Sequence, residues 1–423
     1  MHIAIIGSGI AGMVSAWTLH NAGHLVTVYE SGSYVGGHTN TVPVDVAGQT
    51  YAIDTGFIVF NDWTYPNFIR LLDLIGVASK PTAMSFSVRD ARSGMEYNGT
   101  SLNTLFAQRS NLFRPSFYRM ISDILRFGRE APALLADDDH QLTLGEYVDQ
   151  NKYSRQFVEQ YLLPMGGAIW SAGTAAMRGF PARYFVQFFK NHGMLSVDER
   201  PQWRVVKGGS WNYAKVLVAP FRDRIRLDTP VQSIRRDPTG VTIVAGGQSE
   251  RFDQVVIAAH GDQALSLLSD PSVAEQDVLS GFTYTRNEAV LHTDISLMPR
   301  RRLAWAAWNY HLTGEENAPV PVTYDMNALQ GIDAPERFLV TLNPPVGIAS
   351  ERVLRRISYQ HPHYSPAAVA SQKRWKEING VNRTYFCGAY WGYGFHEDGV
   401  VSALKVAERF GVGLSGRIAV GSA

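Results

Sequence analysis

The fold is decided by the first stretch of the chain, residues 1–30, which read MHIAIIGSGIAGMVSAWTLHNAGHLVTVYE. A continuous apolar run at 2–6 leads into the glycine pattern Gly7-x-Gly9-x-x-Gly12, and an alternating apolar run at 25–29 ends on Glu30. This order predicts a strand, a tight turn, a helix and a second strand. The stretch therefore indicates a parallel βαβ unit of the dinucleotide-binding kind.

The three glycines have separate roles in that unit. Gly7 permits the tight turn, Gly9 lets the backbone approach a pyrophosphate, and Gly12 lets the helix pack on the strand. The first helical turn contains Ile10 and Ala11, and its unpaired N–H groups together with the helix dipole favour an anion. We expect these residues to bind the phosphates of a dinucleotide.

Glu30 lies at the end of the second predicted strand, 18 residues beyond Gly12. A carboxylate at this point accepts hydrogen bonds from a ribose and disfavours a 2′-phosphate. The sequence therefore predicts a nucleotide with an unphosphorylated ribose rather than NADP.

The composition narrows the class of protein. The chain has 423 residues, 45% of them hydrophobic, and its formal net charge of +1 gives no overall field that would attract nucleic acid. A single cysteine, Cys387, excludes an internal disulfide and a cysteine-rich metal site. No apolar run is long enough to span a bilayer, and the nucleotide strand begins at the first residues. We expect a cytoplasmic protein without a cleaved signal, a metal ion or a nucleic-acid partner.

A second group of motifs follows Glu30. A glycine pair, Gly36 and Gly37, opens the segment GGHT, and a predicted strand at 51–60 contains DTGFIVF, with Thr55 and Gly56. Together with GSGIAG and Glu30, these motifs resemble the flavin-dependent amine-oxidase superfamily, which includes protoporphyrinogen oxidase, carotenoid desaturases and some fatty-acid isomerases. The resemblance implies that these residues bind FAD rather than NAD.

The resemblance adds two further residues to the expected FAD site. Many members of the superfamily carry an arginine after the glycine pair, where it meets the cofactor phosphates. This chain has His38 there, and a histidine can still donate a hydrogen bond. The residue that matches Val231 contacts the adenine through its main chain in the superfamily, whereas from the sequence alone Val231 would be a core valine.

We predict an α/β fold in which a Rossmann-like FAD-binding domain is interleaved with an α+β substrate domain. The FAD-binding domain comprises 1–82, 204–281 and 363–423, and the substrate domain comprises 83–203 and 282–362. The first substrate segment has a short strand pair at 85–88 and 95–98, and helical patterns at 102–108, 116–127, 144–150, 154–163 and 184–189. The second has strand candidates at 289–293, 304–310, 320–325 and 338–343.

The second strong motif, TYFCGAYWGYGFHEDGVVSAL, spans 384–404. It predicts a strand, an aromatic and glycine-rich loop, and a helix that begins at Asp398 or Gly399 with Asp398 as its N-cap. In the superfamily this segment closes over the flavin. The N–H groups of Gly399 and Val400, with the helix dipole, would stabilise the negative charge of a reduced flavin. The resemblance thus adds to the cofactor site Gly388, Phe395, Asp398, Gly399 and Val400.

The sequence offers few candidates for proton transfer. A flavin accepts a hydride from a substrate carbon, and the protein supplies position and electrostatics. Amine-oxidising relatives hold a lysine near the flavin, but the matching segment, 284–294, contains none. His396 and Glu397 are proton-transfer candidates beside the closing helix, with a structural role in holding the loop as an equal alternative. Tyr393 is an aromatic candidate for facing the flavin.

The inserted helical segment favours a hydrocarbon substrate. Aromatic and aliphatic residues are interleaved with arginines over 106–129, a pattern typical of a helix that lies on an anionic membrane surface, with an ordinary surface helix as the alternative. The whole chain is similar to bacterial predicted FAD-binding proteins and to the flavoprotein domain fused to plant cyclopropane-fatty-acid synthases. This similarity implies a lipid acyl substrate.

We therefore expect an FAD-dependent oxidoreductase that takes a hydride from a fatty-acyl or other lipid substrate and yields a desaturated or isomerised chain. We expect FAD to be bound non-covalently, because Cys387 lies within the last strand. Two alternatives remain open: an amine or amino-acid oxidase, and a non-catalytic flavin-binding partner of a lipid-modifying enzyme. The lipid hypothesis includes peripheral contact with the inner face of a membrane.

Overall fold

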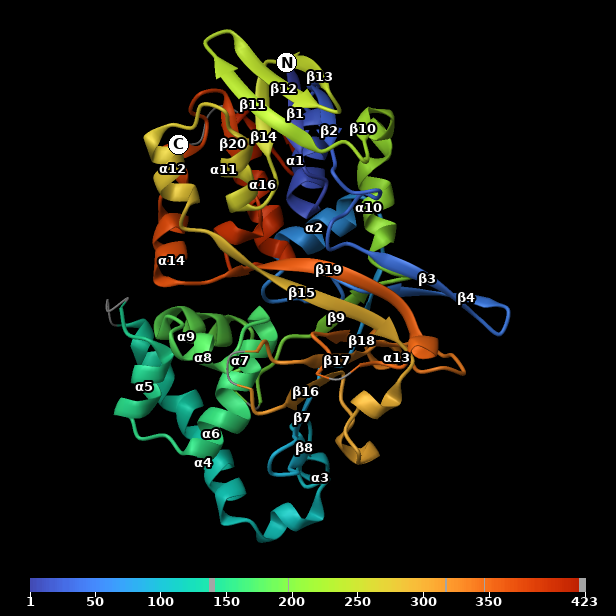
Figure 1. The fold of residues 1–423 in the computed structure, drawn as a ribbon, viewed down its shortest axis with the longest axis vertical. Helices are drawn as coiled ribbons and strands as arrows, with labels where there is room; N and C mark the ends of the chain where they lie inside the picture. Colours follow the sequence, from blue (N-terminus) through green and yellow to red (C-terminus); the bar gives the residue numbers. More distant parts are fainter. Residues whose placement is uncertain (137–140, 197, 316–317, 346, 418–423) are drawn as a thin grey trace.

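The protein is described by a computed structural model that covers residues 1–136, 141–196, 198–315, 318–345 and 347–417. The chain forms two lobes stacked along the long axis of the molecule (Figure 1). The N-terminal strands lie in the upper lobe, and most helices of residues 102–191 lie in the lower lobe.

A five-stranded parallel sheet forms the centre of the upper lobe and confirms the predicted α/β class. Strands β1 (His2–Ile6) and β2 (Leu25–Tyr29) pair in parallel and are joined by helix α1 (Ile10–Asn21), as the first 30 residues predict. The side chains of Ile3 and Ile5 enter one core, and those of Ala4 and Ile6 enter another, because both faces of the sheet are covered. The order β10-β2-β1-β14-β20 is completed by β10 (Ile225–Arg226), β14 (Gln254–Ile257) and β20 (Thr384–Phe386).

Helix α16 (His396–Arg409) packs on α1 and so brings the two ends of the sequence together. A Cβ added to Gly399 would lie 2.6 Å from Ile10 Cγ2, so the contact requires a glycine. The predicted start of this helix was wrong. Asp398 is its third residue rather than its N-cap, and its carboxylate accepts the Phe395 N–H at 2.9 Å. The Gly399 N–H already donates to Phe395 O, which places Gly399 inside the first turn.

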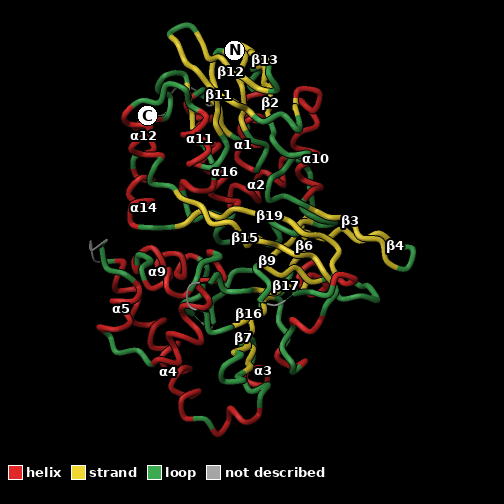
Figure 2. Tube along the Cα trace, in the orientation of Figure 1, coloured by secondary structure: helices red, strands yellow, loops and turns green. Residues whose placement is uncertain are grey.

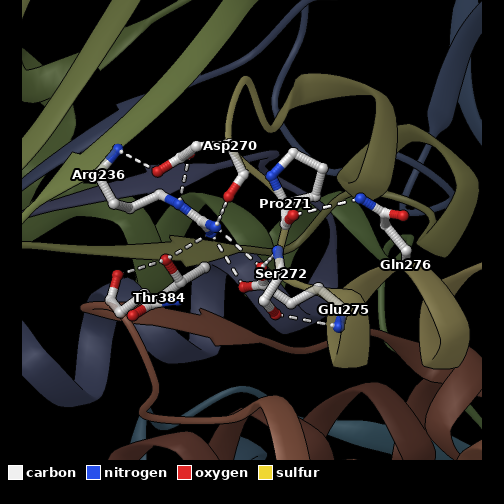
Figure 3. Close-up of polar contacts among 8 residues, drawn as sticks. Arg236, Asp270, Pro271, Ser272, Glu275, Gln276 and Thr384 are labelled. Atoms are coloured by element: carbon white, nitrogen blue, oxygen red, sulfur yellow. Dashed lines mark hydrogen bonds and ion pairs between the residues drawn. The ribbon is translucent and has the colours of Figure 1, made fainter.

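A buried ion pair joins a small antiparallel sheet to the rest of the upper lobe (Figure 3). Arg236 Nη1 and Nη2 donate to the two carboxylate oxygens of Glu275 at 3.0 and 2.8 Å, and Nη1 donates to Thr384 Oγ1 at 3.2 Å. Both charged side chains are buried, and Arg236 Nε also pairs with Asp270 at 2.8 Å, so removing Arg236 would leave the Glu275 carboxylate buried without a counter-charge. The elements joined are β11 (Val231–Asp237), β12 (Gly240–Ala245), β13 (Gln248–Phe252), α12 (Val273–Leu279) and β20.

The lower lobe is built on a seven-stranded sheet of order β19-β15-β18-β17-β16-β7-β8. The long antiparallel pair β15 (Thr283–His292) and β19 (Val353–His363) lies between the two lobes (Figure 1). Strand β19 was not predicted, because its sequence VLRRISYQHPH is polar and lacks apolar alternation. The other strands are β7 (Phe86–Asp90), β8 (Glu96–Asn98), β16 (Trp308–Leu312), β17 (Val322–Asp325) and β18 (Leu339–Leu342).

Helices gather on one side of the lower lobe (Figure 2). The helix predicted at 154–163 continues through a π-helical turn, Val158–Leu162, into α7, and Pro164 lies just after this turn. None of the described helices is both long and apolar enough to cross a membrane. The described α-helices of residues 102–191 are α3 (Leu102–Leu105), α4 (Pro115–Glu130), α5 (Leu144–Gln150), α6 (Arg155–Phe157), α7 (Leu163–Trp170), α8 (Thr174–Arg178) and α9 (Ala182–Asn191).

Asp54 joins two motifs that lie far apart in the sequence. It ends the hairpin of β3 (Thr41–Val46) and β4 (Gln49–Asp54) and accepts the Ser210 N–H at 2.9 Å and the Ser210 hydroxyl at 2.8 Å. Burial raises the pKa of this carboxyl to about 6. The remaining elements are β5 (Phe60–Asn61), α2 (Pro66–Leu74), β6 (Ser79–Pro81), β9 (Trp203–Val206), α10 (Trp211–Val218), α11 (Gly261–Leu267), α13 (Met326–Gln330), α14 (Pro366–Lys373), α15 (Trp375–Ile378), β21 (Val412–Gly413) and β22 (Gly416–Arg417).

The two main sheets draw their strands from different segments of the chain. The five-stranded sheet uses only 1–82, 204–281 and 363–423, and the seven-stranded sheet uses 83–203 and 282–362 together with His363, the last residue of β19. The division into two domains stays a prediction, and residues 418–423 of the first domain lie outside the described residues.

Candidate active site

A cavity of about 620 Å³ lies where the two lobes meet. Its walls come from the glycine turn after β1, the segment 55–59, the end of α7, strand β19 and the loop before α16. This volume is in the range of cofactor and ligand sites. The cavity therefore gathers the N-terminal motif, the C-terminal motif and the middle of the chain at one place.

The glycine turn forms the first end of the cavity. Gly7, Gly9, Ile10 and Ala11 line it, and a Cβ added to Gly9 would meet nothing within 4 Å. Gly9 is the N-cap of α1, and no side chain caps this helix. The unpaired N–H groups of the first turn thus face open space, which suits a phosphate.

Gly12 does not line the cavity and has the packing role that the sequence predicts. A Cβ at Gly12 would lie 2.0 Å from Gly7 O, so a larger residue would collide with the turn itself. The substitution of Gly9 and that of Gly12 should therefore have different consequences, the first for a ligand and the second for the fold.

Glu30 lies beside the glycine turn with its carboxylate held from two sides. Oε2 accepts the Ser8 N–H at 2.9 Å and the Ser8 hydroxyl at 2.5 Å, and Oε1 accepts the Gly32 N–H at 2.8 Å. The Ser31 hydroxyl makes a longer contact of 3.4 Å with Oε1. A ribose hydroxyl can take the place of that weak contact, as the predicted role of Glu30 requires.

The glycine pair closes the turn from the other side. Gly36 forms an isolated parallel bridge with Gly9, and a Cβ added to Gly37 would lie 3.3 Å from Gly9 Cα. Gly36 and Gly37 have φ angles of 127° and 58°, which disfavour other residues. Both residues line the cavity.

His38 lines the cavity and is half-buried. Its ring stacks on Tyr359 at 4.6 Å between centroids and lies 5.2 Å from the His361 ring. Its Nε2 is buried and has no hydrogen-bond partner in the described part of the chain. Burial, and then the nearby His361, hold the pKa of His38 well below its usual range. A neutral imidazole with an unpartnered nitrogen needs a partner from a bound ligand.

His361 is a cavity residue that the sequence did not indicate as part of the site. Asn287 Nδ2 donates to Thr285 O at 3.0 Å, which fixes the orientation of the amide, and the same nitrogen lies 3.1 Å from His361 Nδ1. Nδ1 therefore accepts, and the neutral ring carries its proton on Nε2. Ser171 Oγ lies 2.9 Å from the same Nδ1. Alternation along β19 places Tyr359 on the same face, but this strand was not predicted.

The cavity carries almost no formal charge. Burial lowers the pKa of His361 to about 4 and that of His396 to about 3, and the pKa of His260 is also lowered, first by burial. Among the residues that the structure describes, Glu30 is the only carboxylate in the lining, no lysine or arginine is part of it, and no cluster of His, Cys, Asp or Glu could hold a metal ion.

Aromatic rings form the second end of the cavity. Tyr393 packs on Tyr184 with 4.4 Å between ring centroids, and burial raises its pKa to about 12. Phe395 stacks on Phe188 at 5.1 Å. Other rings that line the cavity are Trp170, Trp308, Tyr324, Tyr364 and Tyr390.

The structure gives His396 and Glu397 strong structural contacts. The His396 ring stacks on Phe57 at 3.5 Å, and its Nε2 lies 3.1 Å from Thr39 Oγ1 and 3.0 Å from Tyr213 OH. Only His396 of the two lines the cavity. Glu397 accepts the N–H groups of Asn67 and Phe68 at 3.0 and 2.9 Å and so caps the start of α2. These contacts correspond to the structural alternative for both residues.

The remaining predicted cofactor residues divide into two groups. Asp398, Gly399 and Val400 do not line the cavity, and burial raises the pKa of Asp398 to about 7. The Gly399 N–H is occupied within the helix. The predicted charge stabilisation by these N–H groups therefore lacks support, because the first turn of α16 begins earlier, at His396. The residues that do line the cavity are Thr55, Gly56, Val231, Gly388 and Phe395.

The residues present fit a bound FAD. The open space at Gly9, the uncapped end of α1, the Glu30 carboxylate and the His38 ring all belong to the lining of one cavity. Gly9 and the start of α1 match a pyrophosphate, and Glu30 matches a ribose. The fold and the site together define a dinucleotide-binding protein of the α/β class.

Comparison with known proteins identifies the family. The family of flavin containing amine oxidoreductases matches residues 10–293, which is more than half of the chain. The chain therefore belongs to this family.

Individual relatives are distant. An L-amino-acid oxidase of Siganus canaliculatus is 21% identical over 329 residues, which cover 69% of this chain and 56% of that protein. The chain spans about half the length of the curated relatives it matches. Among solved structures, a cyclohexylamine oxidase of Brevibacterium oxydans has a TM-score of 0.68 at 16% identity, covering 97% of this chain and 99% of that one. A fatty acid isomerase of P. acnes that produces CLA has a TM-score of 0.67 at 16% identity, covering 96% and 98%.

Proposed function

We propose that the chain holds FAD non-covalently and removes a hydride from a carbon of an uncharged hydrocarbon chain, the acyl chain of a lipid. The observation that carries this proposal is the uncharged lining of the second end of the cavity, where neutral histidines and aromatic rings surround the space. Apolar walls with few polar groups bind hydrocarbon and orient it.

The described lining contains no lysine or arginine, which argues against a substrate that carries a free carboxylate. Burying an unpaired carboxylate costs several kcal/mol, and no lysine or arginine in the described lining could pair with it. An amino acid and a free fatty acid both carry such a group, whereas an esterified acyl chain does not. We therefore propose an ester-linked acyl chain as the substrate.

A substrate with an ammonium group would likewise lack a free partner of opposite charge in the described lining. The carboxylate in the described lining, Glu30, is occupied by the backbone of Ser8 and Gly32 at the ribose end. Aromatic rings such as Tyr393 could attract a cation, and amine oxidases are among the relatives. This candidate stays second because no lysine lines the described cavity.

The chemistry that FAD supplies when bound is the acceptance of a hydride from a substrate carbon. The chain's own residues bind the phosphates at α1 and orient the acyl chain between rings. The neighbouring carbon loses a proton to a water molecule, so that a carbon–carbon double bond forms. Dioxygen or an electron carrier removes the two electrons. If an unsaturated chain loses only the hydride, keeps its protons and regains the hydride at the other end of the allylic system, the product is an isomer and no oxidant is needed.

Cys387 supports non-covalent binding of FAD. Its side chain is buried, its Sγ lies 3.5 Å from Ser15 Oγ, and it does not line the cavity. Burial raises the pKa of this thiol to about 12, which leaves it unreactive.

Product analysis tests this proposal. The FAD-loaded protein is incubated in air with phospholipids that carry methyl-branched or unsaturated acyl chains, and the released chains are examined by mass spectrometry. Loss of two hydrogens or a shifted double bond is expected, and the Gly9→Val variant is the flavin-free control. Peroxide release from a primary amine or polyamine without any change in the lipid would overturn the proposal. An FAD-loaded protein that acts on neither would favour the non-catalytic alternative.

A further inference from the structure

The lower end of the molecule carries apolar side chains that point into solvent. Helix α3, the 3₁₀ turn η1 (Arg109–Phe113) and the start of α4 form this end, which lies opposite the N-terminus along the long axis (Figure 1). Phe113 is 86% exposed and Leu102 is 77% exposed. Leu112 and Tyr118 are also exposed. We call the exposed residues at this end the tip surface; they are Leu102, Arg109, Leu112, Phe113, Tyr118 and Arg119, with the half-buried Arg114 between them.

The tip surface inverts the usual distribution of polar and apolar groups. Asn111 is fully buried, and its Nδ2 donates to Glu96 O at 3.3 Å. Gln108 is buried as well, and its Oε1 accepts the Glu96 N–H at 2.8 Å. The turn is therefore fixed to β8 through its polar side chains, while Phe113 faces outward. A large exposed apolar side chain on such a fixed turn indicates an interaction site.

Contacts within the tip hold its parts together. The Tyr118 hydroxyl donates to Leu112 O at 3.1 Å, and the rings of Phe106 and Tyr118 lie 5.8 Å apart. Arg109 Nη1 donates to Phe106 O at 2.9 Å, and Arg109 Nη2 donates to Asn103 Oδ1 at 2.8 Å. The apolar and cationic groups thus belong to one surface.

The charged residues of the tip surface are all arginines. Residues 97–122 contain three arginines and no aspartate or glutamate, although the whole chain has a net charge of only +1. No carboxylate in the described part of the chain forms a salt bridge with Arg109, Arg114 or Arg119. By contrast Arg126, further along α4, pairs with Glu130 at 2.9 Å.

The structure corrects the amphipathic pattern expected from the sequence. Phe117 and Phe127 are buried in the core, and Phe106 and Ile121 are half-buried, so most of the aromatic face of α4 points inward. Most exposed apolar groups lie at and before the start of α4, and Leu125 is the exposed apolar residue further along the described helix. The partner surface is therefore centred on this end and not on the whole helix.

We propose that the tip surface docks reversibly on a membrane that contains anionic phospholipids. Phe113, Leu112 and Leu102 enter the boundary between headgroups and acyl chains, and Arg109, Arg114 and Arg119 lie against the headgroups. Exposed apolar groups beside unpaired cations fit this occupant, because both kinds of contact are satisfied at once. The inference does not depend on the substrate of the cavity.

Vesicle sedimentation tests the docking. The full-length, FAD-loaded protein is mixed with vesicles of phosphatidylcholine alone or of equal parts phosphatidylcholine and phosphatidylglycerol. We expect binding to the anionic vesicles only, and a fall of about tenfold or more between low and high salt, because headgroup attraction is screened. Phe113→Asp should abolish binding.

The matched control is Val273→Asp. Val273 is 84% exposed at the start of α12, in the upper lobe. Like Phe113→Asp, this variant replaces an exposed apolar residue by aspartate, but at a site away from the tip surface. We expect this variant to bind as the parent does. Equal binding of Phe113→Asp and Val273→Asp, or equal binding to both kinds of vesicle, would overturn the proposal.

A fluorescent label reports the insertion directly. Cys387 is buried, so a cysteine introduced by Phe113→Cys is the accessible thiol for a polarity-sensitive dye. The emission should shift to the blue on adding anionic vesicles, whereas the label on Val273→Cys should not respond. If vesicles cause no shift at residue 113 while Phe113→Asp changes the mass of the protein in light scattering, the surface joins copies of this chain and the proposal is wrong.

Discussion

The two ends of the cavity are lined by different chemical groups. Near Gly9 the wall is main chain, with the free N–H groups of α1 and one carboxylate, Glu30. Near Tyr393 the wall consists of aromatic rings and neutral imidazoles. The first end binds charge through fixed backbone dipoles, and the second end excludes charge. Substitutions at the first end should therefore change cofactor binding, and those at the second should change the choice of substrate.

The largest effect is expected from Gly9→Val. The added side chain has no protein neighbour within 4 Å, so it fills the space of the ligand and leaves the fold intact. We expect the Kd for FAD to rise at least about a thousandfold, ~4 kcal/mol, with little change in the unfolding midpoint. Flavin absorbance and thermal unfolding measure the two quantities. Gly347→Val is the control, since a Cβ there also meets nothing and the residue is outside the cavity.

Glu30→Ala should have a smaller effect at the same end. The change removes a charged acceptor for a ribose and for the Ser8 and Gly32 N–H groups. Hydrogen bonds to charged groups are worth about 1.5–3 kcal/mol, so we expect the Kd for FAD to rise about 10- to 100-fold in titrations followed by fluorescence quenching. An unchanged Kd would contradict the assignment of Glu30 to the ribose.

The second end should make the protein sensitive to acid. Burial lowers the pKa of His396 to about 3, below the ordinary value of 6.5, so the unfolded chain binds a proton that the folded chain does not. The stability held by neutral His396 is full above pH 6.5 and is lost as the pH falls toward 3. At pH 5 the loss is about 2 kcal/mol.

Urea unfolding at pH 8 and pH 5 measures this loss. His396→Gln should make the free energy of unfolding depend less on pH, whereas the control His20→Gln, a change on α1 outside the cavity, should leave the dependence as it is. The same pH dependence in parent and His396→Gln would show that His396 is not held neutral in the fold.

The smallest effect is expected from Tyr393→Phe. The ring packs on Tyr184 and no hydrogen bond of its hydroxyl is seen in the described structure. Removing the hydroxyl should change FAD content and the rate of flavin reduction by less than about twofold, since the ring contacts are kept. A loss of flavin reduction with FAD still bound would instead assign proton transfer to Tyr393.

The first end could be predicted because it is local in sequence. Gly7, Gly9, Gly12 and Glu30 belong to one βαβ unit, so spacing alone places them. The second end could not be predicted in the same way. His361, Ser171 and Asn287 meet from three separate segments, and β19 has no apolar alternation.

The C-terminal motif could be predicted only in part. Its place beside α1 follows the resemblance, but the start of α16 depends on the Phe395 N–H bond to Asp398. The role of Glu397 depends on α2, whose residues lie 329 and 330 positions away in the chain. Local sequence carries no signal for a cap supplied over such a distance.

The central claim is that the second end of the cavity accepts an uncharged hydrocarbon chain, and anaerobic flavin reduction tests it most directly. One acyl chain is offered in three forms to the FAD-loaded protein: esterified in a phospholipid, as the free acid, and as the amine of equal length. We predict that the flavin absorbance bleaches with the ester and persists with the acid and the amine. Bleaching by the amine or the acid while the ester leaves the flavin oxidised would contradict the account.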